Sequence, residues 1–386
     1  MRILHTADWH LGRTLHGESL QTAHETFADH LVDLVEAERI DAVLVAGDVY
    51  DRAIPPVESV ELLGDTLDRL TARTRVVITS GNHDSAVRLG FGAGMFRDRL
   101  SVRTRVAEIG HPIVVPDAEG HDGLVVYPVP YLDPDGTRRE LGGVERTHAA
   151  VVGAAVGRIA EDRARRDPAV PVALLAHEFV GTGETSDSER DIRVGGIDSV
   201  PSAVFRAADP AYVALGHLHR SQRIGDPDRD PLMRYAGSPL AFSFSEAGQV
   251  KSSVIVDFHR DRPVPTVRTV PTPVPRRLVR ARGTLAELES SAWDADRDAW
   301  AEVVVTDPIR TADMMARARA CFPHLLTFAH LPADRVADGP SRITAVADPL
   351  EVLTDFVADA GGRDATADEE QVLREAYEAV RALAVA

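Results

Sequence analysis

The sequence predicts an α/β fold in which two sheets pack on each other and helices flank them. From the N-terminus to about residue 260, short β-branched runs that end in polar residues alternate with helical patterns. This alternation is typical of layered α/β domains rather than of all-helical or all-β domains. The chain has 386 residues, too many for one typical core, so we also expect two or three domains.

Eight segments before residue 260 have the apolar, β-branched composition of strands. The fifth to the eighth of them have less helix between them than the earlier ones, which indicates a second sheet packed on the first. In chain order the strand candidates are residues 2–6, 42–46, 75–79, 124–127, 172–176, 212–215, 232–236 and 253–258.

Three windows between these strands carry apolar residues every three or four positions, as amphipathic helices do. In the first window Phe27, Leu31, Leu34 and Val35 would share one helix face. The helix candidates are residues 20–38, 57–72 and 144–165.

A change of composition follows the first domain, residues 1–262. Residues 263–275 contain prolines at 263, 265, 271, 273 and 275, which exclude a regular helix, so we predict a semi-rigid linker there. Residues 276–347 then mix strand and helix candidates and are expected to form a small α+β domain. Its strand candidates are 277–281, 301–306 and 325–329, and its helix candidates are 284–290 and 312–320.

The last segment, residues 348–386, has two amphipathic patterns at 350–360 and 367–383, joined by Gly361-Gly362. Two such helices bury too little surface to form an independent domain. We therefore expect their apolar faces to pack against something else.

The composition limits the classes of function. A formal net charge of −17 argues against binding nucleic acid through a broad basic face, so a polyanionic substrate needs bound cations or a partner subunit. Cys321 is the only cysteine, which excludes an internal disulfide, and the first residues do not resemble a secretory leader. No apolar stretch is long enough to span a membrane. We expect a folded cytoplasmic protein.

Ligand-type side chains follow the first two predicted strands. Asp8 and His10 lie two residues apart, and in extended backbone both would point the same way and reach one metal ion. Asp48 follows Gly47, whose conformational freedom would let the carboxylate project from the strand end and bridge two cations. Each string alone also fits a solvated turn or a helix cap.

Gly81-Asn82-His83-Asp84 places three functional groups in one turn after the third strand. Asn82 offers a neutral oxygen to a cation, while His83 could stay unliganded and face a substrate. Asp84 could accept from the His83 imidazole and fix its tautomer. An ordinary turn is the weaker interpretation.

Three histidines complete the set. His177 ends the fifth strand, and His217 and His219 follow the sixth in the string Gly216-His-Leu-His. Carboxylate, amide and imidazole groups of this kind hold pairs of divalent cations that clamp one phosphate. The strings together predict a two-metal phosphoesterase site at the carboxyl ends of the strands.

These strings, in this order, resemble the motifs of the calcineurin-like metallophosphoesterases. Longer strings resemble, more specifically, the SbcD family of bacterial nuclease subunits. They are Ala7-Asp-Trp-His-Leu-Gly12, Gly47-Asp-Val-Tyr-Asp51 with Pro55-Pro56, Gly81-Asn-His-Asp-Ser85, Ser186-Asp-Ser-Glu-Arg-Asp191 and Tyr235-Ala-Gly-Ser-Pro239. The resemblance covers nearly the whole chain, with residues 276–347 as a capping domain.

The resemblance implies a ligand set and a mechanism. One metal would be held by Asp8, His10, Asp48 and His219, and the other by Asp48, Asn82, His177 and His217. The family favours Mn²⁺, and the ligand set is consistent with it, although ligand identity alone does not exclude iron, zinc or magnesium. His83, oriented by Asp84, would stabilise the phosphate and help to protonate the leaving oxygen.

The resemblance also implies partners. In the family the C-terminal helices bind the SbcC ATPase, which supplies part of the DNA-binding surface, and the nuclease component is expected to be a homodimer in the complex. The implied activity is a double-strand exonuclease and a single-strand or hairpin endonuclease in DNA repair. Arg13, Arg52, Arg88 and Arg190 are candidates for phosphate contacts, and solvated loop charges explain each of them equally well.

Two other classes of function fit parts of the sequence. An enzyme for small phosphodiesters or phosphomonoesters would use the same site and suit the acidic charge, but has less need of a capping domain and terminal helices. A catalytically silent scaffold is the third class, and the complete ligand set argues against it.

Overall fold

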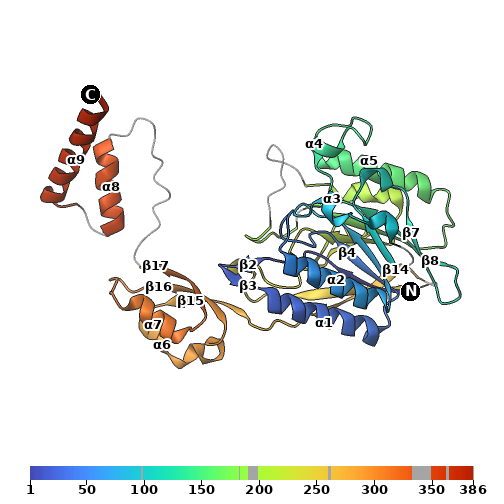
Figure 1. The fold of residues 1–386 in the computed structure, drawn as a ribbon, viewed down its shortest axis with the longest axis horizontal. Helices are drawn as coiled ribbons and strands as arrows, with labels where there is room; N and C mark the ends of the chain where they lie inside the picture. Colours follow the sequence, from blue (N-terminus) through green and yellow to red (C-terminus); the bar gives the residue numbers. More distant parts are fainter. Residues whose placement is uncertain are drawn as a thin grey trace. The chain divides into compact units, whose positions relative to one another are not determined.

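The computed structural model describes residues 1–96, 99–181, 183–189, 199–259, 262–332, 349–361 and 365–385. The chain divides into two compact units, Met1–His330 and Leu331–Ala386. Within the described part of the first unit there are two six-stranded sheets, a three-stranded sheet and a two-stranded hairpin (Figure 1).

The first sheet has the strand order β14-β13-β1-β4-β5-β6. Strands β1, β4, β5 and β6 are parallel, so the carboxyl ends of the first three predicted strands meet at one edge. Its strands are β1 Arg2–Thr6, β4 Ala42–Ala46, β5 Arg75–Thr79, β6 Leu100–Arg103, β13 Ser252–His259 and β14 Arg262–Pro271.

The second sheet has the order β11-β12-β10-β9-β8-β7, with β8, β9, β10 and β12 parallel. A second sheet was expected from the fifth to the eighth strand candidates, but its actual membership differs. The fourth candidate, now β8, belongs to it, whereas the eighth, now β13, pairs antiparallel with β1 in the first sheet. Its strands are β7 Ile113–Pro116, β8 Asp122–Val129, β9 Val172–His177, β10 Tyr212–Gly216, β11 Gln222–Ile224 and β12 Leu232–Tyr235.

Helices cover the outer faces of both sheets, as predicted. Helices α1 (Gln21–Glu38) and α2 (Val57–Thr71) lie side by side over the first sheet (Figure 1). The four residues predicted to share a face of α1 are all buried. Helix α5 (His148–Arg163) begins at Thr147, whose side chain accepts from the backbone N–H of Ala150, an N-cap.

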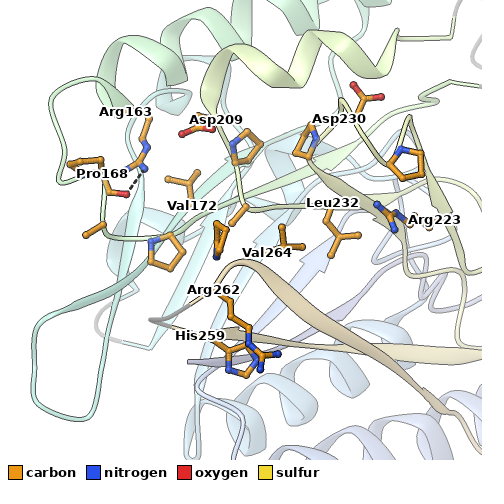
Figure 2. A pocket seen from close by; sticks show the side chains of 17 residues that line it. Arg163, Pro168, Val172, Asp209, Arg223, Asp230, Leu232, His259, Arg262 and Val264 are labelled. Atoms are coloured by element: carbon orange, nitrogen blue, oxygen red, sulfur yellow. Dashed lines mark hydrogen bonds between the residues drawn. The ribbon is translucent and has the colours of Figure 1, made fainter.

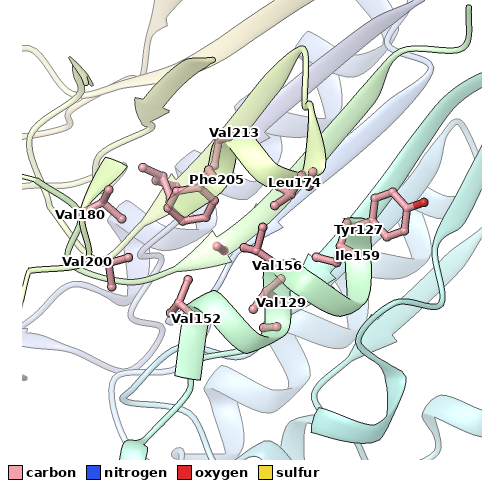
Figure 3. Close-up of a cluster of buried hydrophobic side chains, with 14 of the residues drawn as sticks. Tyr127, Val129, Val152, Val156, Ile159, Leu174, Val180, Val200, Phe205 and Val213 are labelled. Atoms are coloured by element: carbon pink, nitrogen blue, oxygen red, sulfur yellow. The ribbon is translucent and has the colours of Figure 1, made fainter. Parts of the chain in front are cut away.

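Figure 3 shows how α5 covers the second sheet: Val152 and Val156 of the helix lie in one buried cluster with Leu174 of β9 and Val213 of β10. The remaining short elements lie in the connections. They are β2 Thr14–Leu15, β3 Glu18–Ser19, α3 Ala86–Leu89, η1 Ala93–Met95, η2 Val106–Glu108, α4 Pro134–Thr137, η3 Ser202–Ala208 and η4 Phe244–Glu246.

The strands that carry the site are buried on both faces. Along β4, Val43 and Val45 pack in the cluster under the helices, whereas Ala42, Leu44 and Ala46 pack between the two sheets. Successive side chains of a strand point to opposite faces, so both layers of core come from one apolar run. The strand ends are thereby fixed by core packing on both sides.

The predicted proline linker is largely a strand. Residues 262–271 form β14 and pair along β13, from His259↔Arg262 to Ser252↔Pro271. Prolines are tolerated because β14 is the edge strand of its sheet, where an N–H donor is not needed on the open side. Only residues 272–277 connect the first sheet to the next module.

The capping module alternates strands and helices, and its strands are parallel, so it is α/β rather than the expected α+β. Its sheet packs against the β2-β3 hairpin region through a shared buried cluster in which Leu278 and Trp300 meet Leu15, Leu240 and Phe242. Residues 333–348, the end of the predicted domain, lie outside the described residues. The elements are β15 Leu278–Gly283, α6 Leu285–Glu289, η5 Ser291–Asp296, β16 Trp300–Val305, α7 Met314–Cys321 and β17 Leu325–His330.

The second unit contains the two predicted C-terminal helices, α8 (Pro349–Gly361) and α9 (Ala367–Val385), which contact each other. Gly362, half of the predicted junction, lies outside the described residues. In the part of the chain that is described, no helix has the length and apolar composition needed to cross a membrane.

Candidate metal centre

The seven side chains predicted to bind metal all follow or end strands at the carboxyl edges of the two sheets. Two come from the turn after β1, and one each from the turns after β4 and β5. His177 is the last residue of β9, and the final two follow β10. The ligand candidates are Asp8, His10, Asp48, Asn82, His177, His217 and His219.

The backbone at the site is strained rather than extended, which corrects our explanation of the first string. Asp8 and His10 have φ angles of 54° and 45°, and Asp48 has a φ of 49°. Residues with a side chain seldom adopt this left-handed conformation, and such outliers cluster at functional sites. The Asp8 and His10 side chains still converge, because the strained turn directs them and not because the chain is extended.

Two glycines permit the strand ends to approach one another. A Cβ atom at Gly216 would lie 1.9 Å from the carbonyl oxygen of Ala46, and one at Gly47 would lie 2.5 Å from Nδ1 of His177. Gly47 also has a φ of 78°. Any larger residue would push the two sheets apart at this point.

One group of ligand candidates surrounds His10. Its Nε2 lies 3.1 Å from Nε2 of His219 and 3.6 Å from Oδ2 of Asp48. Asp8, His10 and His219 each offer a ligand atom within 4.8 Å of the others. Both carboxylate oxygens of Asp8 accept from the backbone N–H of His217, which holds this carboxylate in place.

The second group surrounds His177. Its Nε2 lies 2.9 Å from Oδ1 of Asn82 and 3.4 Å from Oδ2 of Asp48. His217 Nδ1 lies 3.3 Å from the same Asn82 oxygen. The Asp48 carboxylate therefore stands between the two groups, with Oδ2 facing a histidine of each, while its Oδ1 accepts from the backbone N–H of His83.

The donor set fits divalent cations. Oxygen and imidazole ligands of this kind suit Mn²⁺, Fe²⁺, Zn²⁺ and Mg²⁺ to different degrees. The side chains are almost completely removed from water, with exposed fractions of 0% for Asp8, His10 and His177 and 5% for His217. Buried carboxylates and imidazoles packed so closely are costly unless they are paired or bind metal, so the cluster is suited to cations.

Burial and mutual charge set the protonation of the cluster. Burial raises the pKa of Asp8 to about 7. Burial would lower the pKa of His177, but the carboxylates of Asp48 and Asp8 raise it to about 10. Burial also holds the pKa of His10 well below its usual value and lowers the pKa of His217 to about 3. Cations that bind here must displace protons from the cluster.

His83 and Asp84 lie at the site, but their predicted interaction is wrong. His83 Nδ1 donates to the backbone carbonyl of Asp51, 2.8 Å away, so this carbonyl orients the ring. The Asp84 carboxylate instead accepts from three backbone N–H groups, those of Val49, Tyr50 and Gly81. Burial, together with the charge of Asp48, raises the pKa of Asp84 to about 6. Asp84 thus ties two site loops together.

The four predicted arginines lie in different environments. Arg13 donates to Asp51 and to the backbone carbonyl of Ser188 and lies over the Phe242 ring, so it supports the site loops. Arg52 extends into solvent beside Asp51, with 76% of its side chain exposed. Arg88 is exposed and donates to the carbonyl of Ala53, and Arg190 lies outside the described residues.

The sequence assigned no role to three residues behind the His219 ring, namely Ser188, Glu246 and Lys251. The Ser188 hydroxyl lies 2.6 Å from His219 Nδ1, and Glu246 and Lys251 lie behind it. Ser188 was part of a string that resembled the family, and this string was the one available signal. Glu246 and Lys251 lie in a segment without a motif.

A cavity of about 490 Å³ lies at the opposite, amino ends of β9 and β12, lined by Val172, Leu232 and Arg262 among others (Figure 2). Arg163 donates to the carbonyl of Pro168 at its rim. None of the ligand candidates lines it.

Known proteins resemble this chain over both of its parts. A family model described as calcineurin-like phosphoesterase matches residues 1–221, and an SbcD C-terminal model, described as type 5 capsule protein repressor C-terminal domain, matches residues 274–381. The SbcD component of the nuclease SbcCD from Escherichia coli K12, and that from Escherichia coli O157:H7, are each 32% identical over 320 residues, 80% of this chain and 76% of theirs. A solved dimetal phosphatase from Danio rerio is 12% identical, with a TM-score of 0.41 over 70% of this chain and 95% of its own.

Proposed function

Because this chain belongs to the calcineurin-like phosphoesterases, and within them to the SbcD family, we propose that this metal-dependent phosphodiesterase is the nuclease component of an SbcCD-type complex. Its substrate would be DNA, cleaved as an exonuclease on double-stranded ends and as an endonuclease on single strands and hairpins. The biological role would be DNA repair and the processing of hairpins and blocked ends.

The observation that carries the two-metal proposal is the position of the Asp48 carboxylate. Its Oδ2 atom lies 3.6 Å from His10 Nε2 and 3.4 Å from His177 Nε2. We assign Asp48 as the ligand shared by both cations. Asp8, His10 and His219 would complete one site, and Asn82, His177 and His217 the other. Mn²⁺ is the proposed metal because mixed oxygen and imidazole ligands suit it.

Two divalent cations, when bound, supply Lewis-acid activation of a phosphodiester and a water nucleophile at neutral pH. The chain's own residues position the reactants. His83 uses Nδ1 to donate to the Asp51 carbonyl, 2.8 Å away. We assign proton transfer to the leaving sugar oxygen to Nε2 of the doubly protonated ring, which would become neutral and keep its Nδ1 proton on the carbonyl. The Asp84 carboxylate keeps the two loops that carry Asp48 and His83 at a fixed separation through its backbone contacts.

Exposed arginines are proposed to contact the DNA backbone. Arg52 and Arg88 reach solvent next to the site loops. They are few against a net charge of −17, so most of the positive surface must come from the bound cations and from a partner. SbcC is the proposed partner.

The C-terminal helices support the proposed SbcC contact. Phe356 of α8 and Val372 of α9 are 67% and 65% exposed, although both belong to amphipathic helices. Large apolar side chains left exposed on amphipathic helices are typical of a surface that another chain covers.

A homodimer is proposed from a second exposed apolar patch. The residues lie in or next to α2 and α3, and the two segments meet where Arg88 donates to the Ala53 carbonyl. Several large apolar side chains exposed in neighbouring segments are typical of a surface that another chain covers. The patch consists of Ile54, Val57, Val60, Val87, Phe91 and Met95, with exposed fractions from 47% to 84%.

Hydrolysis of small phosphodiesters is the second candidate, and the net charge of −17 favours it. Such an enzyme would need neither a DNA-binding partner nor the apolar faces of the terminal helices.

The test is digestion of linear and hairpin DNA by the purified chain with Mn²⁺, compared with turnover of a generic small phosphodiester. Asp48→Asn should lower DNA cleavage by a factor of about a thousand, because loss of the shared ligand removes several kcal/mol of transition-state stabilisation. Asp65→Asn, on the exposed face of α2, is the matched control and should cleave like the wild type. Turnover of the small ester alone, unchanged by SbcC and ATP, would favour the second candidate.

A further inference from the structure

His219 is held on three sides by residues outside the ligand set. Its ring Nδ1 lies 2.6 Å from Ser188 Oγ, on the opposite side of the ring from the Nε2 atom that faces His10. Its backbone N–H donates to Glu189, and its backbone carbonyl accepts from Lys251, 2.9 Å away. This residue is therefore fixed in both its main chain and its ring.

The contact with Ser188 continues into the protein interior. Ser188 Oγ donates to the Glu246 carboxylate, and Glu246 forms an ion pair with Lys251. Because the Ser188 proton points to a carboxylate, the hydroxyl must accept from His219, so Nδ1 carries the ring proton. The residues Ser188, Glu246 and Lys251 are 8%, 1% and 4% exposed, so these contacts are shielded from water.

Lys251 has an unusual place in the composition. It is the only lysine of this chain, in which every other one of the 43 Lys and Arg residues is arginine. Its ammonium donates to Glu246, to the carbonyl of His219 and to Ser238 Oγ, and more distantly to Gln249 Oε1, 3.4 Å away. Acceptors gathered around one point suit the compact ammonium group, whereas a planar guanidinium presents its donors as a fork. The geometry of the site therefore favours lysine over arginine.

We propose that Ser188, Glu246 and Lys251 are positioning residues for the His219 imidazole and that they set the affinity of the metal site to which His219 belongs. This inference rests on the proposed function, since it takes His219 as a metal ligand. An imidazole whose second nitrogen donates to a carboxylate-backed acceptor has its tautomer fixed and its ligating nitrogen made more basic. Here a serine hydroxyl stands between the imidazole and the carboxylate.

The proposal predicts an effect on one metal site and not on the other. His177, in the second group, uses its Nδ1 to donate to the carbonyl of Ala46, so its ring does not depend on Ser188. Loss of the Ser188 hydroxyl should weaken one of two binding events, whereas a general loss of stability would weaken both.

The experiment is calorimetric titration of Mn²⁺ into the metal-free full-length chain. In Ser188→Ala we expect one binding event to weaken about tenfold or more, the size of effect that loss of such a supporting contact has, with the other event unchanged. Ser188→Thr, which keeps a hydroxyl, should restore the affinity. Ser253→Ala is the matched control, because this buried hydroxyl has no hydrogen-bond partner among the described residues.

A second variant tests the buried end of the network. Lys251→Arg keeps the charge and should weaken the same binding event as Ser188→Ala, because the fork of donors misplaces Glu246. Wild-type affinity in both variants, or equal weakening of both events, would overturn the inference. A wild-type chain that binds fewer than two Mn²⁺ ions would instead refute the ligand assignment of the proposed function, and the inference with it.

Discussion

The two halves of the candidate metal centre, the groups around His219 and around His177, are built in different ways. His177 is the last residue of β9, and its Nδ1 donates to a main-chain carbonyl, that of Ala46, 2.8 Å away in the other sheet. His219 follows β10, and its Nδ1 contacts the side chain of Ser188, which is backed by Glu246 and Lys251.

The two histidine rings therefore depend on different parts of the structure for their orientation. The orientation of His177 follows from the packing of the two sheets, because the Ala46 carbonyl belongs to a strand buried on both faces. The orientation of His219 depends on side chains contributed by loops. A substitution in a loop can therefore alter one half of the centre while the other is kept.

The largest expected effect is a loss of stability in the half around His219, which side chains hold in place. Lys251→Met would leave the Glu246 carboxylate buried without its cation, so the free energy of unfolding should fall by about 3–5 kcal/mol in urea denaturation. The double variant Lys251→Met with Glu246→Gln removes the stranded charge and should recover much of this loss. A single variant as stable as the wild type would show that the ion pair between Lys251 and Glu246 does not stabilise the structure around His219.

A somewhat smaller loss of stability is expected in the half around His177, whose ring is held by a main-chain carbonyl. The Cβ atom in Gly216→Ala would lie 1.9 Å from the Ala46 carbonyl that orients His177, so the strands must shift, at a cost of about 1–3 kcal/mol in unfolding free energy. Gly157→Ala, in α5 with open space around its Cβ, should instead stabilise by about 0.5–1 kcal/mol. Equal behaviour of the two variants in thermal unfolding would contradict the role of Gly216.

The smallest expected effect comes from Phe242, whose ring contacts histidines in one half of the candidate centre. The Phe242 ring makes edge contacts with His10 and His219, at centroid distances of 5.2 Å and 5.4 Å. Phe242→Leu should cost about 0.5–1.5 kcal/mol of stability and weaken Mn²⁺ binding only at the site proposed for these histidines. Phe205→Leu, in the core under α5, should cost similar stability and leave both Mn²⁺ affinities unchanged. If calorimetry showed weaker Mn²⁺ binding in Phe205→Leu and unchanged binding in Phe242→Leu, Phe242 would have no role in the site.

Much of the fold could be predicted because its signals are local. Each of the eight strand candidates coincides with a strand, and the apolar face of α1 is buried as its periodicity predicts. A run of β-branched residues followed by a glycine and a polar residue predicts three features at once: a strand, the residue where it ends, and the polar side chain that follows it. This is why the ligand candidates could be named from the sequence and are found together.

The parts that could not be predicted depend on distant or compensating residues. The left-handed backbone at Asp8 and Asp48 is unfavourable for either residue alone and exists because the surrounding core imposes it. Strand β14 forms despite its prolines because its outer edge is open. Ser188, Glu246 and Lys251 are ordinary surface types, and only the fold brings them to His219.

The lone lysine gives this protein an unusual amine chemistry. Lys251 carries the only side-chain amine and is 4% exposed, while the α-amino group of Met1 donates to the carbonyl of Phe258. Reagents that acylate amines can reach the ε-amino group only when the structure around His219 opens. The rate of acylation at Lys251 should therefore report how often the structure beside the candidate metal centre opens locally. Mass spectrometry can measure this rate without an engineered label.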